Sequence, residues 1–538
     1  MLARVATTLL LLLIPWIGVT VLRRNREKVN GDVARLPGPI QSLANWIWGH
    51  ELIVNQLQAM EMYASWTDIF GPVFKITGAM LHPDIVVLSD NTAVAHVFSR
   101  PYTYVKSPAF RPPVSNLMGE GLVWAEGETH MRQRKYMASA FTQEAVKGMA
   151  SDISECAEKL VGKMTNQILS SSSKDGLKIN VVDYTSSCTL DIIGRVGFGH
   201  DFKSQTTFAG KETDDEIIRR DWKGHVQMGT TFLAFVAPIL FRTFPFIAKL
   251  PIAQMQTQGI IKVTVQKLAK RLMDREKATA EFLEKRGGKD KGNILSILLR
   301  ASKEYIGEGG LTEKDILDNI STLALVGHET TAGCINFTLL ELARNPAMQR
   351  RLREEITNEG NNLSYDDIQK LPYLDAVIKE GLRVWPASPQ TERIVLQDDV
   401  IPLSRPIKGA DGKMIESIAV KEGQVFHIPM MVMNTNPNVW GPDGRAFNPD
   451  RWLTSGGVPK PSELPHGWSG LATFCDGPRN CIGWRLAVFE YKVIIAHLVR
   501  SIEFSSVPGT IVHRKISPTL QPVTDGEGGL LPVQIKLV

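Results

Sequence analysis

The chain begins with one uninterrupted apolar run, residues 5–22, which contains no charged side chain. At the rise of an α-helix, 18 residues extend about 27 Å, close to the thickness of a bilayer core. Four basic residues follow between positions 23 and 28, whereas only Arg4 precedes the run. This asymmetry predicts a membrane anchor whose C-terminal body faces the cytosol. A cleaved signal peptide is the alternative. Its basic residues would precede the apolar run, whereas here they follow it, and no small-residue cleavage site ends the run.

A stiff turn follows the basic flank, at the Leu-Pro-Gly-Pro sequence of residues 36–39. Two prolines restrict the backbone there and remove amide donors. We interpret residues 1–30 as the anchor with its basic flank and residues 31–538 as one catalytic body.

The body begins with a strand-like pattern and continues with helical periodicity. Residues 72–78 and 84–90 alternate as two short strands around a His-Pro turn, and helical patterns then extend to about residue 395. Polar loops at 170–176 and 284–292 show no change of composition typical of a domain boundary. The predicted fold class is therefore mainly α with small β-sheets (α+β).

A second apolar segment, residues 232–247, is interrupted by Pro238, Arg242 and Pro245. It is too short and too interrupted to span a bilayer. Two interpretations stay open: a core helix followed by a turn, or a hydrophobic patch that enters the membrane beside the anchor.

Composition excludes several classes of protein. The 538 residues are 43% hydrophobic and 22% charged, with a net charge of +5, which is typical of a large globular core. No dense basic block with interleaved aromatic residues is present, so nucleic-acid binding has no support. The five cysteines are an odd, scattered set, which indicates a reducing compartment rather than a disulfide framework. A structural zinc site would require a second cysteine pair or a histidine cluster at ligand spacing.

The strongest chemical signal is the stretch 474–483, which contains F-x-x-G-x-R-x-C-x-G. A soft thiolate such as that of Cys481 can bind iron and donate electron density to bound dioxygen. The glycines permit a tight backbone, so that amide groups approach the sulfur. Arg479 carries a permanent charge that suits a carboxylate.

This motif resembles the cysteine loop of the cytochrome P450 family. The resemblance implies a triangular, mostly helical fold with one N-terminal transmembrane helix and a haem b (heme b) group. It also implies that Cys481 is the axial ligand of the haem iron. Phe474 then packs against the sulfur side of the haem and Arg479 binds a propionate.

A long helix is predicted from Thr312, with a capping-box-like start, to the Asn-Pro sequence at 345–346. Midway lies Val-Gly-His-Glu-Thr-Thr at 326–331, where glycine and hydroxyl side chains can loosen the helix and open a groove. Glu329 and Thr330 match the acid and alcohol that deliver protons in the family. Val326 stands where alanine is commoner and adds bulk above the haem.

Two E-x-x-R sequences place a carboxylate and a guanidinium on one helical face, at 341–344 and at 380–383. Such pairs are common on surfaces and contribute little. The second is followed by Phe-Asn-Pro-Asp-Arg-Trp at 447–452, which is similar to the family's loop that returns an arginine. We therefore predict that Glu380, Arg383 and Arg451 form a structural lock behind the haem.

Further propionate partners are implied by the same resemblance. Residues 127–134 resemble the helix with the W-x-x-x-R pattern, with His130 in place of the tryptophan and Arg134 as the arginine. The ring of His130 can still donate a hydrogen bond to a carboxylate. A solvated amphipathic helix is the alternative for this stretch. Arg393 matches another propionate-binding position.

Taken together, the motifs occur along the chain in the same order as in the family. They imply a monooxygenase at the endoplasmic reticulum membrane that receives NADPH electrons from NADPH-cytochrome P450 reductase, with cytochrome b5 as a second electron donor, and that uses dioxygen. A haem-thiolate isomerase or dehydratase and a non-enzymatic haem sensor are the alternatives.

The sequence also predicts the class of substrate. Stretches around 110–122, 320–327, 388–391 and 520–524 are largely apolar, which predicts a lipophilic substrate. The sequence of residues 383–442 resembles that of fungal microsomal members that modify terpenoids and other secondary metabolites. A fatty acid or a xenobiotic is an alternative substrate.

Overall fold

The computed structural model describes residues 31–80, 82–171, 176–206, 214–244, 263, 265–278, 293–304, 310–360 and 363–538. The predicted anchor at 5–22 and the predicted loop at 284–292 lie outside these residues, as does part of the 170–176 loop.

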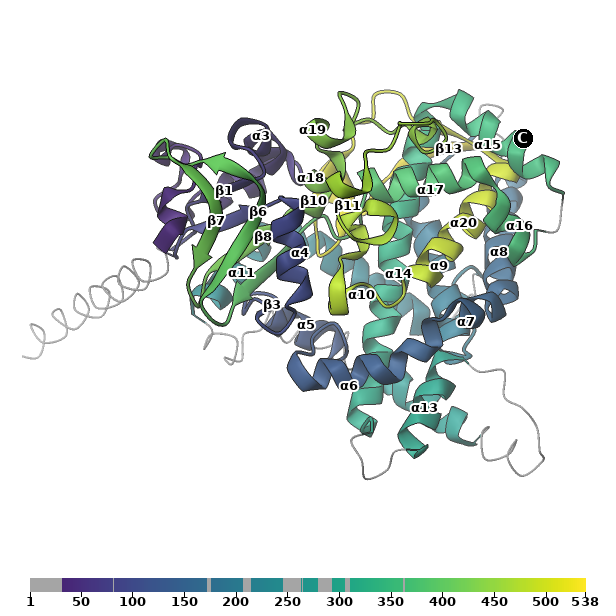
Figure 1. Ribbon diagram of the computed structural model, residues 1–538. Helices are drawn as coiled ribbons and strands as arrows, with labels where there is room; N and C mark the ends of the chain where they lie inside the picture. Colours follow the sequence, from purple (N-terminus) through teal and green to yellow (C-terminus); the bar gives the residue numbers. More distant parts are fainter. Residues whose placement is uncertain are drawn as a thin grey trace, which may run out of the picture.

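The described part of the chain is rich in helices, which surround one long central helix (Figure 1). The α-helices are α2 Glu51–Gln56, α3 Glu61–Phe70, α4 Asn91–Ser99, α5 Arg111–Met118, α6 Gly127–Met137, α7 Gln143–Gly148, α8 Ala150–Ser170, α9 Val181–Phe198, α10 Asp214–Gly229, α11 Phe232–Thr243, α13 Ile294–Glu304, α14 Glu313–Arg344, α15 Pro346–Asn358, α16 Tyr365–Lys370, α17 Pro372–Val384, α18 Met430–Thr435, α19 Pro437–Trp440 and α20 Trp484–Ser501. This content confirms the predicted mainly helical class.

Strands form small sheets beside the helical body. They are β1 Val73–Ile76, β2 Ile85–Leu88, β3 Tyr104–Lys106, β4 Leu177–Asn180, β5 Thr391–Val395, β6 Asp399–Lys408, β7 Met414–Val420, β8 Val425–Ile428, β9 Ile502–Ser506, β10 His513–Ile516, β11 Leu520–Thr524, β12 Glu527–Gly528 and β13 Pro532–Leu537. The largest sheet has the order β1-β2-β8-β5-β3, with β2 and β8 parallel. The two strands predicted near residues 72–90 are confirmed as the antiparallel pair β1 and β2.

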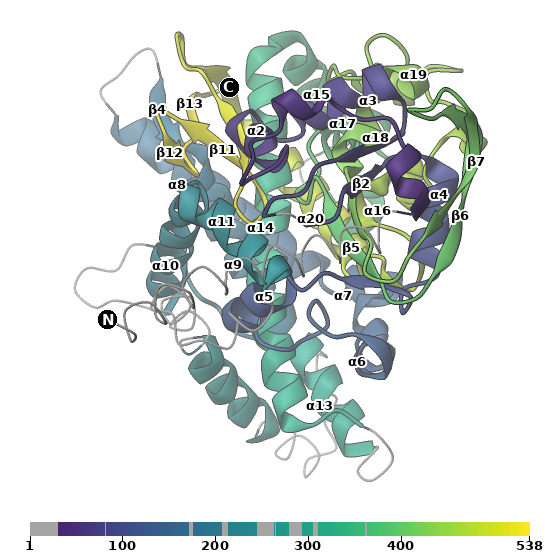
Figure 2. The ribbon, with the colours of Figure 1, turned by 90° about the vertical axis from the view of Figure 1, so that its left-hand side faces the viewer.

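Helix α14 runs through the middle of the helical body (Figure 2) and begins with the predicted capping box. Thr312 accepts a hydrogen bond from the N–H of Asp315, whose side chain accepts one from the N–H of Thr312. Helix α14 is continuous over all 32 residues, so the predicted loosening at its hydroxyl and glycine residues does not break it and stays a prediction. Gly327 also permits close packing, since a Cβ there would come within 2.7 Å of the Ile193 side chain on α9.

The apolar segment predicted at 232–247 is described as far as residue 244. It forms α11, which buries Ile239 and Arg242 but leaves Phe232 and Leu233 half exposed. Arg242 binds Glu51 at 2.5 Å and Glu392 at 3.3 Å, so this end of α11 belongs to the core. Among the described helices, none alone has the length and apolar composition of a membrane span; α10 and α11 meet that test only as a pair bent by 80°.

Candidate active site

The cysteine motif forms a tight loop immediately before α20. The N–H of Cys481 donates to the carbonyl of Phe474 at 2.8 Å and closes the loop. Gly477 has a φ of +67°, and a Cβ there would lie 2.4 Å from the carbonyl oxygen of Phe98. This position therefore requires glycine, as the motif predicts. Gly483 has a φ of −89° and room for a side chain, so its backbone does not require glycine.

Cys481 alone among the five cysteines is exposed, as expected of a ligand rather than a core residue. Protein atoms packed around the sulfur still desolvate it, which raises the pKa of the thiol to about 11. A hydrogen bond from the backbone of Gly483 partly opposes this rise. The loop therefore brings an amide to the sulfur, and a bound metal cation would stabilise the thiolate.

Basic side chains from four separate segments gather beside this loop. Lys106 lies on β3, His130 and Arg134 on α6, Arg393 on β5 and Arg479 in the loop itself. Burial and the neighbouring guanidinium groups of Arg479 and Arg393 together lower the pKa of Lys106 to about 7, against the opposing effect of Glu126. Burial and then Arg479, Lys106 and Arg134 lower the pKa of His130 to about 3. The structure thus brings the predicted propionate partners together.

The cluster has a surplus of positive charge. Glu126 contacts Arg479 and lies 3.6 Å from Lys106, whereas the guanidinium of Arg134 donates to the neutral Asn480. Arg479 also has a buried Nε without a hydrogen-bond partner in the described part of the chain. These residues fit a dianionic group such as the two propionates of a haem, with His130 as a neutral donor.

Lys106 and Glu126 were not predicted as members of this site. No motif distinguishes either residue in the sequence. Lys106 faces the cluster only because β3 pairs with β5, where it lies opposite Arg393.

Helix α14 presents Val326, Gly327 and Thr330 as half-buried residues along one face. The hydroxyl of Thr330 donates to the carbonyl of Val326 at 2.7 Å. Thr331 is buried on another face of the helix. Thr330 is therefore the hydroxyl of this pair that lies at an accessible surface of α14.

Glu329 is buried and held by hydrogen bonds. Ser186 on α9 donates to its Oε1 at 2.8 Å, and Nε2 of His328 lies 3.3 Å from the same oxygen. Burial raises the pKa of Glu329, but the contacts with His328, Ser186 and Trp222 prevail and hold it below the usual value. The side chain is therefore a carboxylate that can accept a proton.

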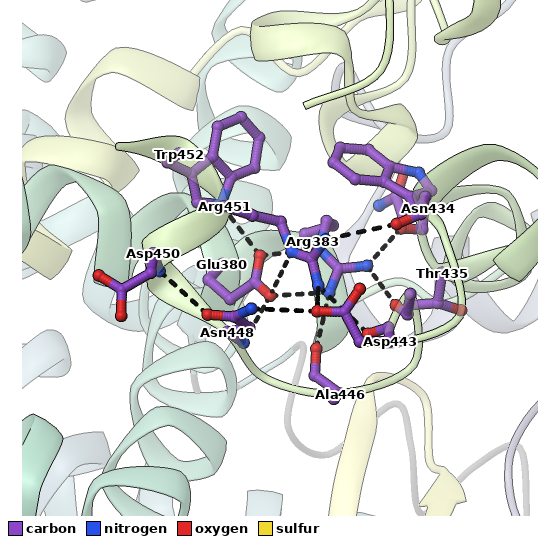
Figure 3. Close-up of polar contacts among 12 residues, drawn as sticks. Glu380, Arg383, Asn434, Thr435, Asp443, Ala446, Asn448, Asp450, Arg451 and Trp452 are labelled. Atoms are coloured by element: carbon purple, nitrogen blue, oxygen red, sulfur yellow. Dashed lines mark hydrogen bonds and ion pairs between the residues drawn. The ribbon is translucent and has the colours of Figure 1, made fainter. Parts of the chain in front are cut away.

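Glu380 lies between two arginines in a buried cluster (Figure 3). Arg383 donates to both of its oxygens at 2.8 Å, and Arg451 donates at 3.0 Å. The indole N–H of Trp452 and the backbone N–H of Asn448 also donate hydrogen bonds to this carboxylate, at 2.9 and 2.7 Å. The structure thus brings the three predicted lock residues together.

The cluster is connected to the cysteine loop through Asn434. Arg383 donates to the backbone carbonyl of Asn434 at 2.9 Å, and the side chain of Asn434 accepts from the N–H of Ala472 at 2.8 Å. Ala472 lies two residues before Phe474. The other E-x-x-R pair differs, because Arg344 is half exposed and its nitrogen lies 3.7 Å from Glu341.

Of the apolar stretches predicted to line a substrate pocket, the first and the fourth lie against α14 at positions 319 and 333, and the fourth also contacts the residue before the third. The N–H of Leu122 donates to Asn319 at 2.9 Å, which joins the first stretch to this helix. The carbonyl of Leu520 would lie 3.6 Å from a Cβ at Gly333, so β11 also approaches α14. The N–H of Leu520 donates to the carbonyl of Ala387, next to the third stretch.

Comparison with known proteins agrees with this geometry. A sequence model described as Cytochrome P450 matches residues 37–525. Cytochrome P450 monooxygenase claP of Ampulloclitocybe clavipes is 32% identical over 89% of this chain and 88% of its own. Cytochrome P450 monooxygenase claU of the same organism is 30% identical over 99% and 98%. Cytochrome P450 monooxygenase 205 of Postia placenta is 30% identical over 93% and 92%.

These relatives cover nearly the whole chain, and their fungal sources confirm the predicted likeness to fungal members of the family. The family implies a haem with thiolate ligation, a redox partner, a lipophilic substrate and dioxygen. The chain belongs to the cytochrome P450 family of monooxygenases.

Proposed function

We propose that this monooxygenase inserts one oxygen atom into a C–H bond of a lipophilic secondary metabolite such as a terpenoid. In this proposal, Cys481 ligates the haem iron, and His130, Arg134, Arg393 and Arg479 hold the propionates. The bound haem would supply oxygen activation, with NADPH electrons from a flavoprotein reductase, assisted by cytochrome b5. The protein's own task is then to hold the haem, exclude water and supply protons.

The observation that carries the proposal is the accessible hydroxyl of Thr330 beside the buried carboxylate of Glu329. Oxygen insertion needs two protons delivered at the right time, and an acid next to an alcohol can deliver them. A haem-thiolate isomerase or dehydratase takes no electrons from a reductase and has no use for this pair. A haem sensor does not need it either.

The decisive experiment reconstitutes the protein with haem and a NADPH-dependent reductase. We expect that a lipophilic substrate increases NADPH oxidation and yields a product with one added oxygen atom, which 18O2 labelling would trace. An isomerase or dehydratase would convert an oxygenated substrate without NADPH. A sensor would bind haem but neither consume NADPH nor form product.

Apolar lining alone supports a class of substrate rather than a single compound. The stretches around α5, α14 and β11 contribute few charges, which favours a ligand without formal charge over a fatty-acid carboxylate. Competition of terpenoid, fatty-acid and aromatic xenobiotic panels in a substrate-binding difference spectrum would rank the three classes.

We also propose that the protein is a single-pass protein of the endoplasmic reticulum, with the body in the cytosol. The support is the charge asymmetry around residues 5–22 and an apolar patch on the described surface. This patch, which we call the Trp46 patch, comprises Ile40, Leu43, Trp46, Phe232 and Leu233. Trp46 is 86% exposed, a high value for so large an apolar side chain.

A further inference from the structure

Glu126 is a carboxylate that stands at the start of a helix but does not cap it. Its backbone is extended at the N-cap position of α6, and its side chain accepts no hydrogen bond from the amides of that helix. An acid at this position ordinarily accepts such a bond and is stabilised by the helix dipole. The two oxygens of Glu126 instead contact β3 and the cysteine loop.

The carboxylate joins two of the cations beside that loop. Its Oε1 accepts a hydrogen bond from the backbone N–H of Lys106 at 3.2 Å and lies 3.6 Å from the ammonium of the same residue. Its Oε2 contacts a terminal nitrogen of Arg479. The carbonyl oxygen of the preceding Ala125 accepts from Arg479 at 2.9 Å and from Lys106 at 3.5 Å. Two consecutive residues thus hold one cation from β3 and one from the loop.

These ion pairs are largely removed from water. The side chains of Glu126, Lys106 and Arg479 are 15, 11 and 7% exposed, so solvent screens their charges less than it screens charges at the surface. In the described part of the chain, no other carboxylate lies within 4.0 Å of Lys106 or Arg479. The charge of Glu126 also acts on Arg393, which lies opposite Lys106 on the neighbouring strand.

Affinity for propionates does not explain a carboxylate at this place. The cations would attract the propionates more strongly without Glu126, because it competes for the same groups. The carboxylate does two other things. It fixes the side chains of Lys106 and Arg479, and it lowers the positive potential of the cluster. A lower positive potential disfavours the arrival of a further electron nearby.

We propose that Glu126 is a positioning residue of the haem site, which holds Lys106 and Arg479 at the propionates and keeps the reduction potential of the iron below the value that the cations alone would set. The proposal rests on the proposed function, in which Arg479 and its neighbours hold the propionates of a haem bound by Cys481. The step concerned is the transfer of one electron from the reductase to the iron. It adds one negative charge to the site and needs no proton from Glu126.

The reduction potential of the purified haem protein, measured by spectroelectrochemistry at pH 6, tests the role of this charge. Lys106 carries its proton at this pH, because its pKa is about 7 and nearby propionates favour the charged form. A single charge in a partly desolvated site changes a nearby equilibrium by about tenfold. We therefore expect Glu126→Gln to favour reduction about tenfold, which raises the one-electron potential by about 59 mV.

Two comparisons separate the effect of charge from that of structure. Glu128→Gln removes the same charge from an exposed side chain of α6, and it should leave the potential unchanged because water screens that charge. Glu126→Asp retains the charge and should keep the potential near that of wild type. A Glu126→Gln variant with the potential of Glu128→Gln would overturn the proposal, as would an equal increase in Glu126→Asp.

A second route removes the same charge if Glu126→Gln alone impairs folding. Lys106→Gln should lower the potential, because it removes a cation. Adding Glu126→Gln to Lys106→Gln removes the carboxylate from a site that no longer contains its lysine partner, and the potential should then increase by about the same amount. Equal potentials in Lys106→Gln and the double variant would show that the charge of Glu126 does not act on the iron.

A vibrational measurement without turnover tests the positioning role. The propionate bending band in the resonance Raman spectrum depends on hydrogen bonds to the propionates, and it should shift in Glu126→Gln but not in Glu128→Gln. An unchanged band in Glu126→Gln refutes the positioning role. A wild-type protein that binds no haem through a thiolate would refute the proposed function instead. Where thiolate-bound haem is present, the potential and the Raman band decide the role of Glu126 whether or not product forms.

Discussion

Cys481 and Cys475 lie six positions apart, but their surroundings differ. Cys481 is exposed and has the N–H of Gly483 near its sulfur. Cys475 has its sulfur 3.6 Å from that of Met430, and burial raises the pKa of its thiol. The thiol of Cys475 is therefore packed against its protein neighbours. Cys481 is the cysteine of this loop that can bind a metal.

We predict that Cys481→Ala abolishes the red-shifted Soret band of the reduced carbon monoxide complex, because that band requires a thiolate opposite the carbon monoxide. The absorbance spectrum of the reduced, carbon monoxide-saturated protein checks this. Cys475→Ala should retain the band. A band that survives in Cys481→Ala but disappears in Cys475→Ala would exchange the two assignments.

A second prediction at this scale concerns Thr330, whose hydroxyl lies at the accessible face of α14. We expect Thr330→Ala to keep electron uptake but to lose about tenfold or more in coupled product, because proton delivery contributes at least this much. The measurement compares NADPH oxidised, peroxide released and product formed, with the same reductase for wild type and variant.

Thr331→Ala is the control for that experiment, because the adjacent helical residue points about 100° away and is buried here. If Thr331→Ala uncouples the reaction and Thr330→Ala does not, the alcohol has been placed one residue too early. If both variants keep full coupling, the acid and alcohol mechanism is wrong.

At the scale of elements, the buried Glu380 joins α17 to the loop that carries Arg451. Glu380→Gln would leave the buried guanidinium of Arg383 without its anion, whereas Arg451 keeps Asp443 at 2.8 Å. Removing one partner of such a buried pair costs about 3–5 kcal/mol of unfolding free energy. We predict a large decrease in thermal stability together with weaker haem retention, since Asn434 connects this cluster to the cysteine loop. Thermal unfolding and the haem absorbance ratio measure the two effects.

Glu341→Gln tests the same chemical change in the other E-x-x-R pair. Arg344 is 47% exposed and the contact is long, so the loss should stay below about 1 kcal/mol. A Glu380→Gln variant as stable as Glu341→Gln would show that the cluster is not a lock.

The elements also show which features a sequence can predict. The start of α14, the two first strands and the glycine at position 477 follow from local rules, namely a capping box, alternation and a positive φ. The close packing of Gly327 was not predicted, because it depends on Ile193, more than a hundred residues away in sequence. No local pattern contains such a contact.

The whole molecule explains why the charged site was only partly predicted. His130, Arg134, Arg393 and Arg479 could be named because each stands in a motif. Lys106 and Glu126 join them through the pairing of β3 with β5 and through the packing of the residues before α6, which only the assembled fold determines. Sequence motifs thus identified His130 and the three arginines, but neither Lys106 nor the carboxylate of Glu126 that partly balances the charge.

The Trp46 patch is likewise a property of the assembled surface. Its members come from the N-terminal segment and from the start of α11, which meet where Trp48 packs against the rings of Phe232 and Phe235 at 5.7 and 5.8 Å. Arg242 fixes the far end of α11 to the core through Glu51, so the two ends of this helix have different surroundings. The core interpretation of segment 232–247 therefore holds for the far end of α11, and the membrane interpretation stays a prediction for its exposed start.

We predict that deletion of residues 1–28 leaves part of the protein on membranes after a high-salt wash, because apolar contact, unlike ion pairing, persists in salt. Adding Trp46→Glu and Phe232→Glu to the deletion should release the protein into the supernatant, since both charges would enter the patch. The matched variant places glutamate at Ile69 and Val400, which are also exposed but outside the patch. Immunoblots of pellet and supernatant measure the fractions. Complete release of the simple deletion would show that the patch does not hold the body on the bilayer, whereas equal release by both double variants would mean that added charge alone detaches it.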